Sequence, residues 1–347
     1  MDKAPTINDV AREAGVSKTT AVFILNERPN FQAAPATRER VRDAVRKLGY
    51  RRSGLARALS TGRIFTVGVV LRMERLSRSS ATYGVYAKDV LASVARTCAE
   101  AGLRMTLIPF PVVGALSVDD VVDRRVDGLI VISLYDDSFA RQLYASGFPT
   151  VTIGSGYAER RVAFDQRGGA REATEHLLKL GHTRIVHAFG ENAGALATEE
   201  RRAGFSEALR AHGLDPDAPG RQLSRPKAVA ALRLPEGERP TAIFAYNDGD
   251  AWAIGVAARE MGLRVPEDLS LVGFDNNVLA ETSVPPLTTV ENPLDAQTCE
   301  ALRILHGLWK GKEVAPAAPL PARLIIRRST TAPAAPRSFI PTKETLS

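Results

Sequence analysis

From Phe65 onward, short apolar runs alternate with amphipathic helical patterns, and this alternation limits the possible folds more than any other feature. Strict alternation of strand and helix is typical of parallel sheets covered by helices on both faces, because parallel strands need a crossover connection. Such sheets bind ligands outside the carboxyl ends of their strands. The predicted strands are Thr66–Leu71, Arg104–Pro109, Gly128–Ile132, Thr150–Ile153, Arg184–Ala188, Ala242–Tyr246 and Leu269–Phe274. The predicted helices are Val85–Ala101, Ser138–Ser146, Arg167–Leu180, Glu199–Ala211, Asp248–Met261 and Asp295–Lys310.

The first fifth of the chain carries all of its excess positive charge. Residues 1–63 contain 13 Lys/Arg and 6 Asp/Glu, a net charge of +7, whereas the remaining residues contain 33 of each sign. A short basic segment ahead of a neutral body indicates that the segment binds a polyanion.

Three short helical patterns divide this basic segment. Thr6 begins the first as a capping box, with Asp9 three residues later. Ser17 begins the second, which extends over Lys18–Asn26, and a third apolar face covers Thr37–Gly49. Two helices joined by a tight turn and packed on a third form a helix-turn-helix, whose second helix enters the major groove of DNA.

The order of residues in the head, residues 1–52, resembles the lactose-repressor/galactose-repressor (LacI/GalR) family of bacterial transcription regulators. Residues 6–17 carry the resemblance, together with Thr20, Asn26, Thr37–Val41 and Leu48–Tyr50. The resemblance implies that DNA is contacted by Thr6, Ser17, Lys18, Thr19, Thr20, Val22, Phe23 and Asn26.

Two residues of the second helix depart from the family's pattern. After Thr20 the family usually continues Val-Ser-Arg, whereas this chain has Ala21-Val22-Phe23. An arginine in place of Phe23 could donate to two acceptors of a guanine, and that contact is absent here. We therefore expect an unusual operator, read by Lys18, Thr19, apolar contact with thymine methyl groups, or bases outside the usual set.

Residues 53–63 resemble the family's hinge helix, which becomes ordered when two subunits meet on DNA. The resemblance implies that Leu59 opens a base step in the minor groove and that Arg57 contacts phosphate or the groove. Apolar wedges of this kind unstack bases and bend the duplex. The alternative is that Leu55 and Leu59 simply pack together along one helix face.

The resemblance continues over the body, residues 64–330, through blocks such as Arg125–Ile130, His176–His182 and Val272–Asn276. It implies an α/β fold with two lobes of parallel sheets flanked by helices, like a periplasmic binding protein, joined by crossovers near residues 163, 292 and 322. The loop Met73–Thr82 is longer than is usual after the first strand. The Ala/Pro-rich tail, residues 331–347, has no heptads, so we expect a homodimer rather than a tetramer.

Three polar positions match the family's ligand site. Arg201 lies near the start of a helix, Asn247 follows a strand, and Asp275 ends one. Charge-assisted hydrogen bonds from such groups suit hydroxyl-rich or carboxylate ligands. For each position alone, a surface ion pair or an ordinary helix cap is the alternative. The further candidates for effector binding are Tyr86, Asp165 and Trp252, and the two aromatic residues are equally compatible with a core role.

These features predict a ligand-responsive, sequence-specific transcription regulator, most simply a repressor. It would bind a palindromic operator in double-stranded DNA as a homodimer and respond to a small polar effector such as a sugar. The alternative is a solute-binding receptor whose N-terminal helices only pack or dimerise. The basic head and the absence of a signal-peptide pattern favour the regulator.

Enzymatic motifs are absent from the sequence, so we expect no catalysis and no cofactor. His176, His182 and His187 lack the spacing of zinc ligands, and there is no nucleotide-binding glycine loop. No apolar run is long enough to span a bilayer, so no membrane partner is expected. The two cysteines are far apart, which favours a reducing cytoplasm, where such a protein would associate with the nucleoid.

Overall fold

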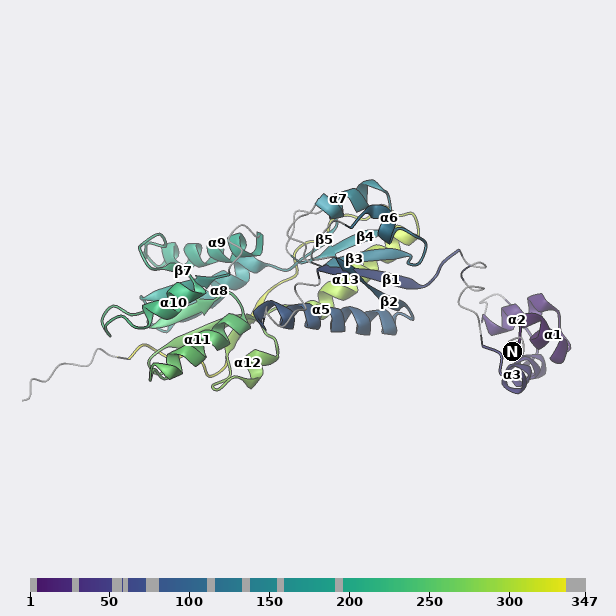
Figure 1. Cartoon of the computed structure of the whole chain (residues 1–347), viewed down its shortest axis with the longest axis horizontal. Coiled ribbons are helices and arrows are strands. Elements are labelled where there is room, and N and C mark those ends of the chain that lie inside the picture. The colour runs from purple at the N-terminus through teal and green to yellow at the C-terminus, as the bar shows by residue number, and fades with distance from the viewer. Residues whose placement is uncertain are drawn as a thin grey trace, which may run out of the picture. The chain divides into compact units, whose positions relative to one another are not determined.

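The computed structural model describes residues 5–26, 31–51, 58, 62–72, 81–110, 116–132, 138–154, 159–190 and 196–334. The chain forms two compact units, Met1–Phe65 and Thr66–Ser347. The first contains the head, with helices α1 (Ile7–Glu13), α2 (Lys18–Leu25) and α3 (Pro35–Leu48) (Figure 1). The predicted hinge contacts Arg57 and Leu59 lie outside the described residues. None of the helices within the described ranges is both long and apolar enough to cross a bilayer.

The three helices of the head pack around one small apolar core. Each helix contributes fully or almost fully buried side chains, the largest being Val10, Ile24 and Val41 respectively. Ser17 begins α2, because its Oγ accepts a hydrogen bond from the backbone N–H of Thr20 at 3.1 Å. The helix-turn-helix predicted from the apolar spacing is therefore present, and α3 begins two residues earlier than expected, at a proline, which is favoured in a first helical turn.

The second unit contains two lobes, each a sheet with helices on both faces (Figure 1). The N-lobe contains β1 (Thr66–Arg72), α5 (Ala81–Glu100), β2 (Arg104–Phe110), α6 (Val118–Val121), β3 (Gly128–Ile132), α7 (Ser138–Ala145), β4 (Thr150–Ile153), β5 (Arg161–Val162) and α13 (Leu294–Trp309). The C-lobe contains α8 (Gln166–Lys179), β6 (Ile185–Phe189), α9 (Leu196–Ala211), β7 (Gln222–Ser224), α10 (Arg225–Ala231), β8 (Ala242–Ala245), α11 (Asp248–Glu260), β9 (Ser270–Asp275), α12 (Val278–Thr282), β10 (Thr288–Glu291) and β11 (Arg323–Ile325).

The strand orders confirm the predicted α/β class. The N-lobe sheet has the order β2-β1-β3-β4-β5, and the C-lobe sheet has the order β11-β10-β9-β8-β6-β7. Neighbouring strands are parallel except for the pair β10–β11, which is antiparallel. The chain passes to the C-lobe between β5 and α8, returns between β10 and α13, and crosses once more between α13 and β11.

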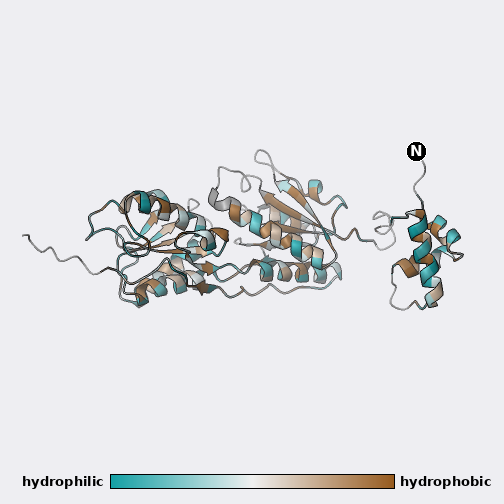
Figure 2. Cartoon of the chain, turned by 90° about the horizontal axis from the view of Figure 1, so that it is seen from below, coloured by the Kyte–Doolittle hydropathy of each residue, from teal (hydrophilic) through white to brown (hydrophobic). Residues whose placement is uncertain are grey.

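Apolar side chains fill both faces of each sheet. In the N-lobe, α5 and α13 cover one face, and α7 with the short α6 covers the other. In the C-lobe, α8 and α9 cover one face, and α10 and α11 the other. Figure 2 shows hydrophobic residues concentrated on the strands and on the helix faces that turn toward them. The sheets therefore form rigid platforms whose strand ends can position polar side chains.

The contact between α8 and α9 depends on a glycine. A Cβ atom at Gly204 of α9 would overlap the carbonyl oxygen of Arg167 and lie 2.9 Å from the backbone nitrogen of Arg171 and 3.0 Å from the Cβ of Ala170. Because two of these three atoms belong to the backbone of α8, no side-chain rotation can relieve the overlap. The close approach of the two helices therefore requires glycine at this position.

Replacing Gly204 with alanine is expected to lower the free energy of unfolding of the C-lobe by about 1–3 kcal/mol, the usual cost of overpacking, measured by urea unfolding. Alanine favours a helix by about 1 kcal/mol over glycine, so a loss of stability must come from the forced separation of α8 and α9. Gly255→Ala in α11 is the matched control, because its new Cβ would contact only the end of the Leu271 side chain, at 3.2 Å. Equal effects of the two substitutions would contradict the prediction.

Candidate functional site

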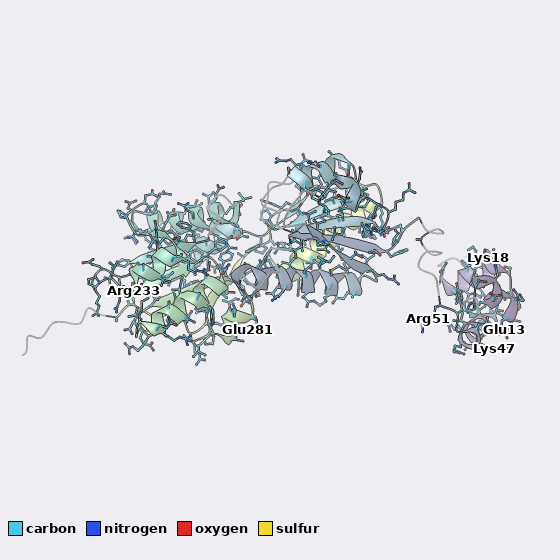
Figure 3. The ribbon with its side chains drawn as sticks, viewed as in Figure 1. Glu13, Lys18, Lys47, Arg51, Arg233 and Glu281 are labelled. Carbon is cyan, nitrogen blue, oxygen red and sulfur yellow. The ribbon has the colours of Figure 1, made fainter. Side chains whose placement is uncertain are left out.

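The exposed face of α2 carries most of the predicted DNA contacts. Ser17, Lys18, Thr19 and Asn26 are exposed. Val22 and Phe23 are half-buried, as is Thr20, whose Oγ1 lies 2.9 Å from Ser17 Oγ. Lys18 lies at the start of α2, apart from Glu13 and Lys47, which form an ion pair between α1 and α3 (Figure 3). Lys18 is thus exposed at the end of α2 where the predicted DNA contacts begin.

Thr6, the other predicted DNA contact of the head, is exposed at the start of α1. Its backbone N–H and its hydroxyl donate to Asp9 Oδ2 at 2.8 and 2.7 Å, as the capping pattern predicted. These hydrogen bonds, with a smaller contribution from Arg12, lower the pKa of Asp9. The hydroxyl of Thr6 therefore already has a partner, and its backbone marks the start of the helix.

A buried arginine lies at the centre of a polar cluster in the C-lobe. Arg201 of α9 is 4% exposed, its Nε donates to Gln166 Oε1 at 2.8 Å, and its Nη1 donates to the carbonyl oxygen of Tyr246. The guanidinium carbon lies 3.7 Å from the centroid of the Phe274 ring and 4.5 Å from that of Tyr246. Cation–π contacts of this kind are strongest where water is excluded. Together these contacts fix the guanidinium in one orientation, beside Asp275.

Asp275, the last residue of β9, is the anionic partner of this arginine. Its Oδ1 lies 3.6 Å from Arg201 Nη2, a distance that permits an ion pair but not a hydrogen bond. Its φ of 96° is a conformation that residues other than glycine rarely adopt, and such strain is concentrated at binding sites. Burial raises the pKa of the Asp275 carboxyl, opposed by Arg201 and by Asn292, whose Nδ2 donates to Oδ1 at 3.3 Å. A ligand hydroxyl could bridge the two charged groups, since they do not hydrogen-bond to each other.

Asn247 and Asp248 follow β8 and have different roles. Asn247 Oδ1 accepts from the backbone N–H of Asp250 at 2.8 Å and so caps α11. Asp248 is completely buried, and its two oxygens accept from Thr289 Oγ1 at 2.5 Å and from the backbone N–H of Asn277 at 2.8 Å. Burial raises the pKa of Asp248 to about 8. Through its hydrogen bonds this carboxyl links α11 to β10 and to the loop after β9.

The other three effector candidates have different surroundings. Tyr86 of α5 packs against the apolar core of the N-lobe. Asp165 is exposed and caps α8, accepting from the backbone N–H of Gly168 at 2.7 Å. Trp252 is 45% exposed on α11 and lines a shallow groove with Val284 and Pro285. For Asp165 and Trp252 the structure therefore shows a helix cap and a groove wall.

Three residues that the sequence analysis did not single out belong to the cluster. Gln166 and Asn292 hold Arg201 and Asp275 through the hydrogen bonds given above, and both are buried. Asp89 of α5 has a raised pKa, first because of burial and second because of the negative charge of Asp275. In the sequence, Gln166 is indicated only by its position next to Asp165, and Asn292 only by its position directly after a strand. The described residues contain no group of three or more His, Cys, Asp or Glu able to hold a metal ion.

Two family models match the chain. Residues 6–53 match "Bacterial regulatory proteins, lacI family", and residues 174–330 match "Periplasmic binding protein-like domain". Among curated proteins, the HTH-type transcriptional regulator CelR of Thermobifida fusca is 32% identical, over 94% of this chain and 98% of its own length. The HTH-type transcriptional regulator DegA of Bacillus subtilis is 33% identical, over 94% of this chain and 98% of its own length.

Solved structures match over almost the whole chain as well. A lac repressor dimer bound to operator and the anti-inducer ONPF has a TM-score of 0.78 and 26% identity, covering 95% of this chain and 100% of that one. The complex of the transcriptional regulator CelR with cellobiose has a TM-score of 0.64 and 30% identity, covering 94% of this chain and 99% of that one. The likeness therefore includes both the head and the two lobes.

Proposed function

Because this chain belongs to the LacI family of bacterial transcription regulators, we propose that it binds a palindromic operator as a homodimer and changes its operator affinity when a small polar effector occupies the C-lobe cluster around Arg201 and Asp275. The observation that carries the proposal is the joining of two modules in one chain: a basic helix-turn-helix and a body whose buried arginine and aspartate converge at strand ends. The protein would act on chromosomal DNA in the nucleoid.

The effector that fits the cluster best is a sugar or a related polyhydroxy metabolite. A carboxylate and a guanidinium 3.6 Å apart can bind adjacent hydroxyl groups, one as acceptor and the other as donor. The buried rings of Tyr246 and Phe274 pack against the Arg201 guanidinium and hold it in place for such a ligand. The cellobiose bound to the related CelR supports the same class of ligand. A thermal-shift screen of mono- and disaccharides, with cellobiose included, would identify the effector.

The DNA-binding proposal predicts a symmetric footprint and a steep dependence on salt. A twofold dimer contacts two half-sites about one helical turn apart. With three phosphate contacts in each subunit, the slope of log affinity against log salt concentration would be about −5, since each neutralised phosphate contributes roughly −0.9. Footprinting on the DNA upstream of the protein's own gene and titrations at several salt concentrations would measure both. A single asymmetric half-site, or affinity that salt does not change, would contradict the proposal.

Regulation, rather than catalysis, is the activity of the curated relatives. We accordingly propose that ligand binding is the whole function of the body and that the ligand leaves unchanged. Recovery of the screened sugar unaltered after prolonged incubation with the protein would support this, and its conversion to a product would refute it.

A further inference from the structure

The face that α2 presents for recognition is unusually apolar. Over its described length α2 carries one basic side chain, Lys18, and two large apolar ones outside the buried face, Val22 and Phe23. Among the residues that the structure describes, Leu25 and Phe31 pack against the apolar core of the head. Val22 and Phe23, which the structure also describes, are not part of that core. Both side chains share the helix face of Lys18, Thr19 and Asn26, at helical spacing. The apolar surface therefore lies within the predicted contact face.

Phe31 holds the ring of Phe23. The two rings meet edge to face, with centroids 5.2 Å apart and an interplanar angle of 70°. Phe31 is itself fixed, because it packs against the head core and because Arg38 of α3 donates from Nη2 to its carbonyl oxygen at 3.0 Å. A second bond from Arg38 Nε to the carbonyl oxygen of Ala33, at 3.3 Å, holds the same segment. The orientation of Phe23 is thus set by α3 as well as by α2.

A phenyl ring in the major groove can be matched by only one feature of the base edges. Every base presents hydrogen-bond donors or acceptors there, and thymine alone adds an apolar group, its C5-methyl. A donor or acceptor covered by a phenyl ring loses its water without gaining a partner, which is unfavourable. Burial of a methyl group against the ring is favourable.

We infer that Phe23, positioned by Phe31, selects a thymine in each half-site by contact with its C5-methyl group. The inference rests on the proposed function, because it takes α2 to be the element that enters the major groove. Specificity at this base pair then comes from shape and apolar burial, with no hydrogen bond from Phe23. Phe31 is a positioning residue that acts through Phe23.

The test removes single methyl groups from the DNA. An operator selected from random sequences is resynthesised with deoxyuridine in place of thymidine, at one symmetric pair of positions at a time. Uracil pairs as thymine does and lacks only the methyl group. Each buried methyl contributes about four-fold to affinity, so replacement in both half-sites should weaken binding about 15-fold at one pair of positions. Replacement at the remaining pairs should change affinity less than two-fold.

Variant proteins connect that methyl group to the aromatic pair. In Phe23→Ala the 15-fold effect of deoxyuridine should disappear, and in Phe23→Leu most of it should remain. Phe31→Ala should reduce the deoxyuridine effect while leaving the dependence of affinity on salt unchanged. Phe31→Tyr, which keeps an aromatic ring, should show the same deoxyuridine effect as the parent. Gln32→Ala, an exposed neighbour outside the ring pair, is the matched control and should keep the full effect. Thermal unfolding of each variant shows whether the head remains folded.

The outcomes separate the inference from the function on which it rests. The inference is overturned if no deoxyuridine position changes affinity by more than two-fold, or if folded Phe23→Ala keeps the same methyl dependence as the parent. In either case Phe23 and Phe31 are only a packing pair of a head that still selects DNA by other residues. If random selection yields no preferred sequence at all, the proposed DNA-binding function fails instead.

Discussion

Replacing Arg201 by alanine is expected to abolish the effector response while leaving ligand-free operator affinity nearly unchanged. Arg201 is buried and pairs with Asp275 at 3.6 Å, so its loss removes the proposed donor to the effector and leaves a buried carboxylate without its cation. Truncating one partner of a buried charged pair weakens binding by about 2–5 kcal/mol, a loss of thirty-fold or more. It should also lower the free energy of unfolding by about 3–5 kcal/mol. Calorimetry with the sugar identified by screening, together with operator titration and urea unfolding, measures the three quantities.

Asp275→Asn separates the loss of binding from the loss of stability. The substitution keeps the shape of the side chain and removes the negative charge, which burial already disfavours by raising the pKa of the carboxyl. It should therefore weaken effector binding with a smaller loss of stability than Arg201→Ala. Arg202→Ala is the matched control, because Arg202 lies next to Arg201 on α9 but pairs with Gln222 Oε1, at 2.8 Å. If both site variants bind the effector normally, the assignment of effector binding to Arg201 and Asp275 is wrong.

Acidification from pH 6.5 to pH 4 is expected to destabilise the C-lobe by about 3 kcal/mol through His187 alone. This side chain is completely buried on β6 between the rings of Phe205 and Phe244, and its Nδ1–H donates to the carbonyl oxygen of Phe244 at 3.1 Å. Burial lowers the pKa of His187 to about 3 from a model-peptide value of 6.5. Between these values the unfolded chain binds a proton that the folded chain does not, so stability falls as the pH falls, at about 1.4 kcal/mol per pH unit.

Urea unfolding at several pH values from 4 to 7 measures this slope. In His187→Leu the slope of unfolding free energy against pH should decrease by about 1.4 kcal/mol per pH unit, the contribution of one proton, whatever the variant's stability at neutral pH. His212→Gln, which removes an exposed histidine, is the control and should keep the parent slope. Identical slopes for His187→Leu and the parent would show that burial does not exclude the proton from this site.

The helices of the body and several of its strands could be predicted from the sequence, because a helical apolar period extends over many residues and an unbroken apolar run indicates a strand buried on both faces. Strands β3 and β4 and the start of α11 were predicted at their observed residues. The short strands β5, β7, β10 and β11 were not predicted, since two to four residues carry little periodic signal and their pairing depends on the edge of a neighbouring strand. Helix α5 begins at Ala81, four residues before its prediction.

The charged residues of the candidate site could be predicted from the sequence, whereas Gln166 and Asn292, which hydrogen-bond to them, could not. Arg201 was expected near the start of a helix and Asp275 at the end of a strand, and the two side chains lie 3.6 Å apart. At the start of α8, however, Asp165 caps the helix, whereas the adjacent Gln166 points into the lobe and accepts from Arg201. Which of the two neighbouring residues points inward depends on where the first turn of α8 begins. The outward direction of Trp252 on α11 likewise depends on which helix face meets the sheet. Such one-residue differences in direction are decided by packing, which the sequence pattern does not specify.

The three passages of the chain between the lobes have a consequence for how this gene can be edited. Helix α13 completes the N-lobe, although it lies in sequence between two neighbouring strands of the C-lobe, β10 and β11. Neither lobe is therefore a continuous stretch of codons, and neither can be exchanged for a homologous lobe by one recombination cassette. A stop codon just after β10 would remove a helix from one lobe and an edge strand from the other, so that both would be damaged by a single lesion. The head, in contrast, is contiguous at the start of the chain, so it can be exchanged as one block without cutting into either lobe.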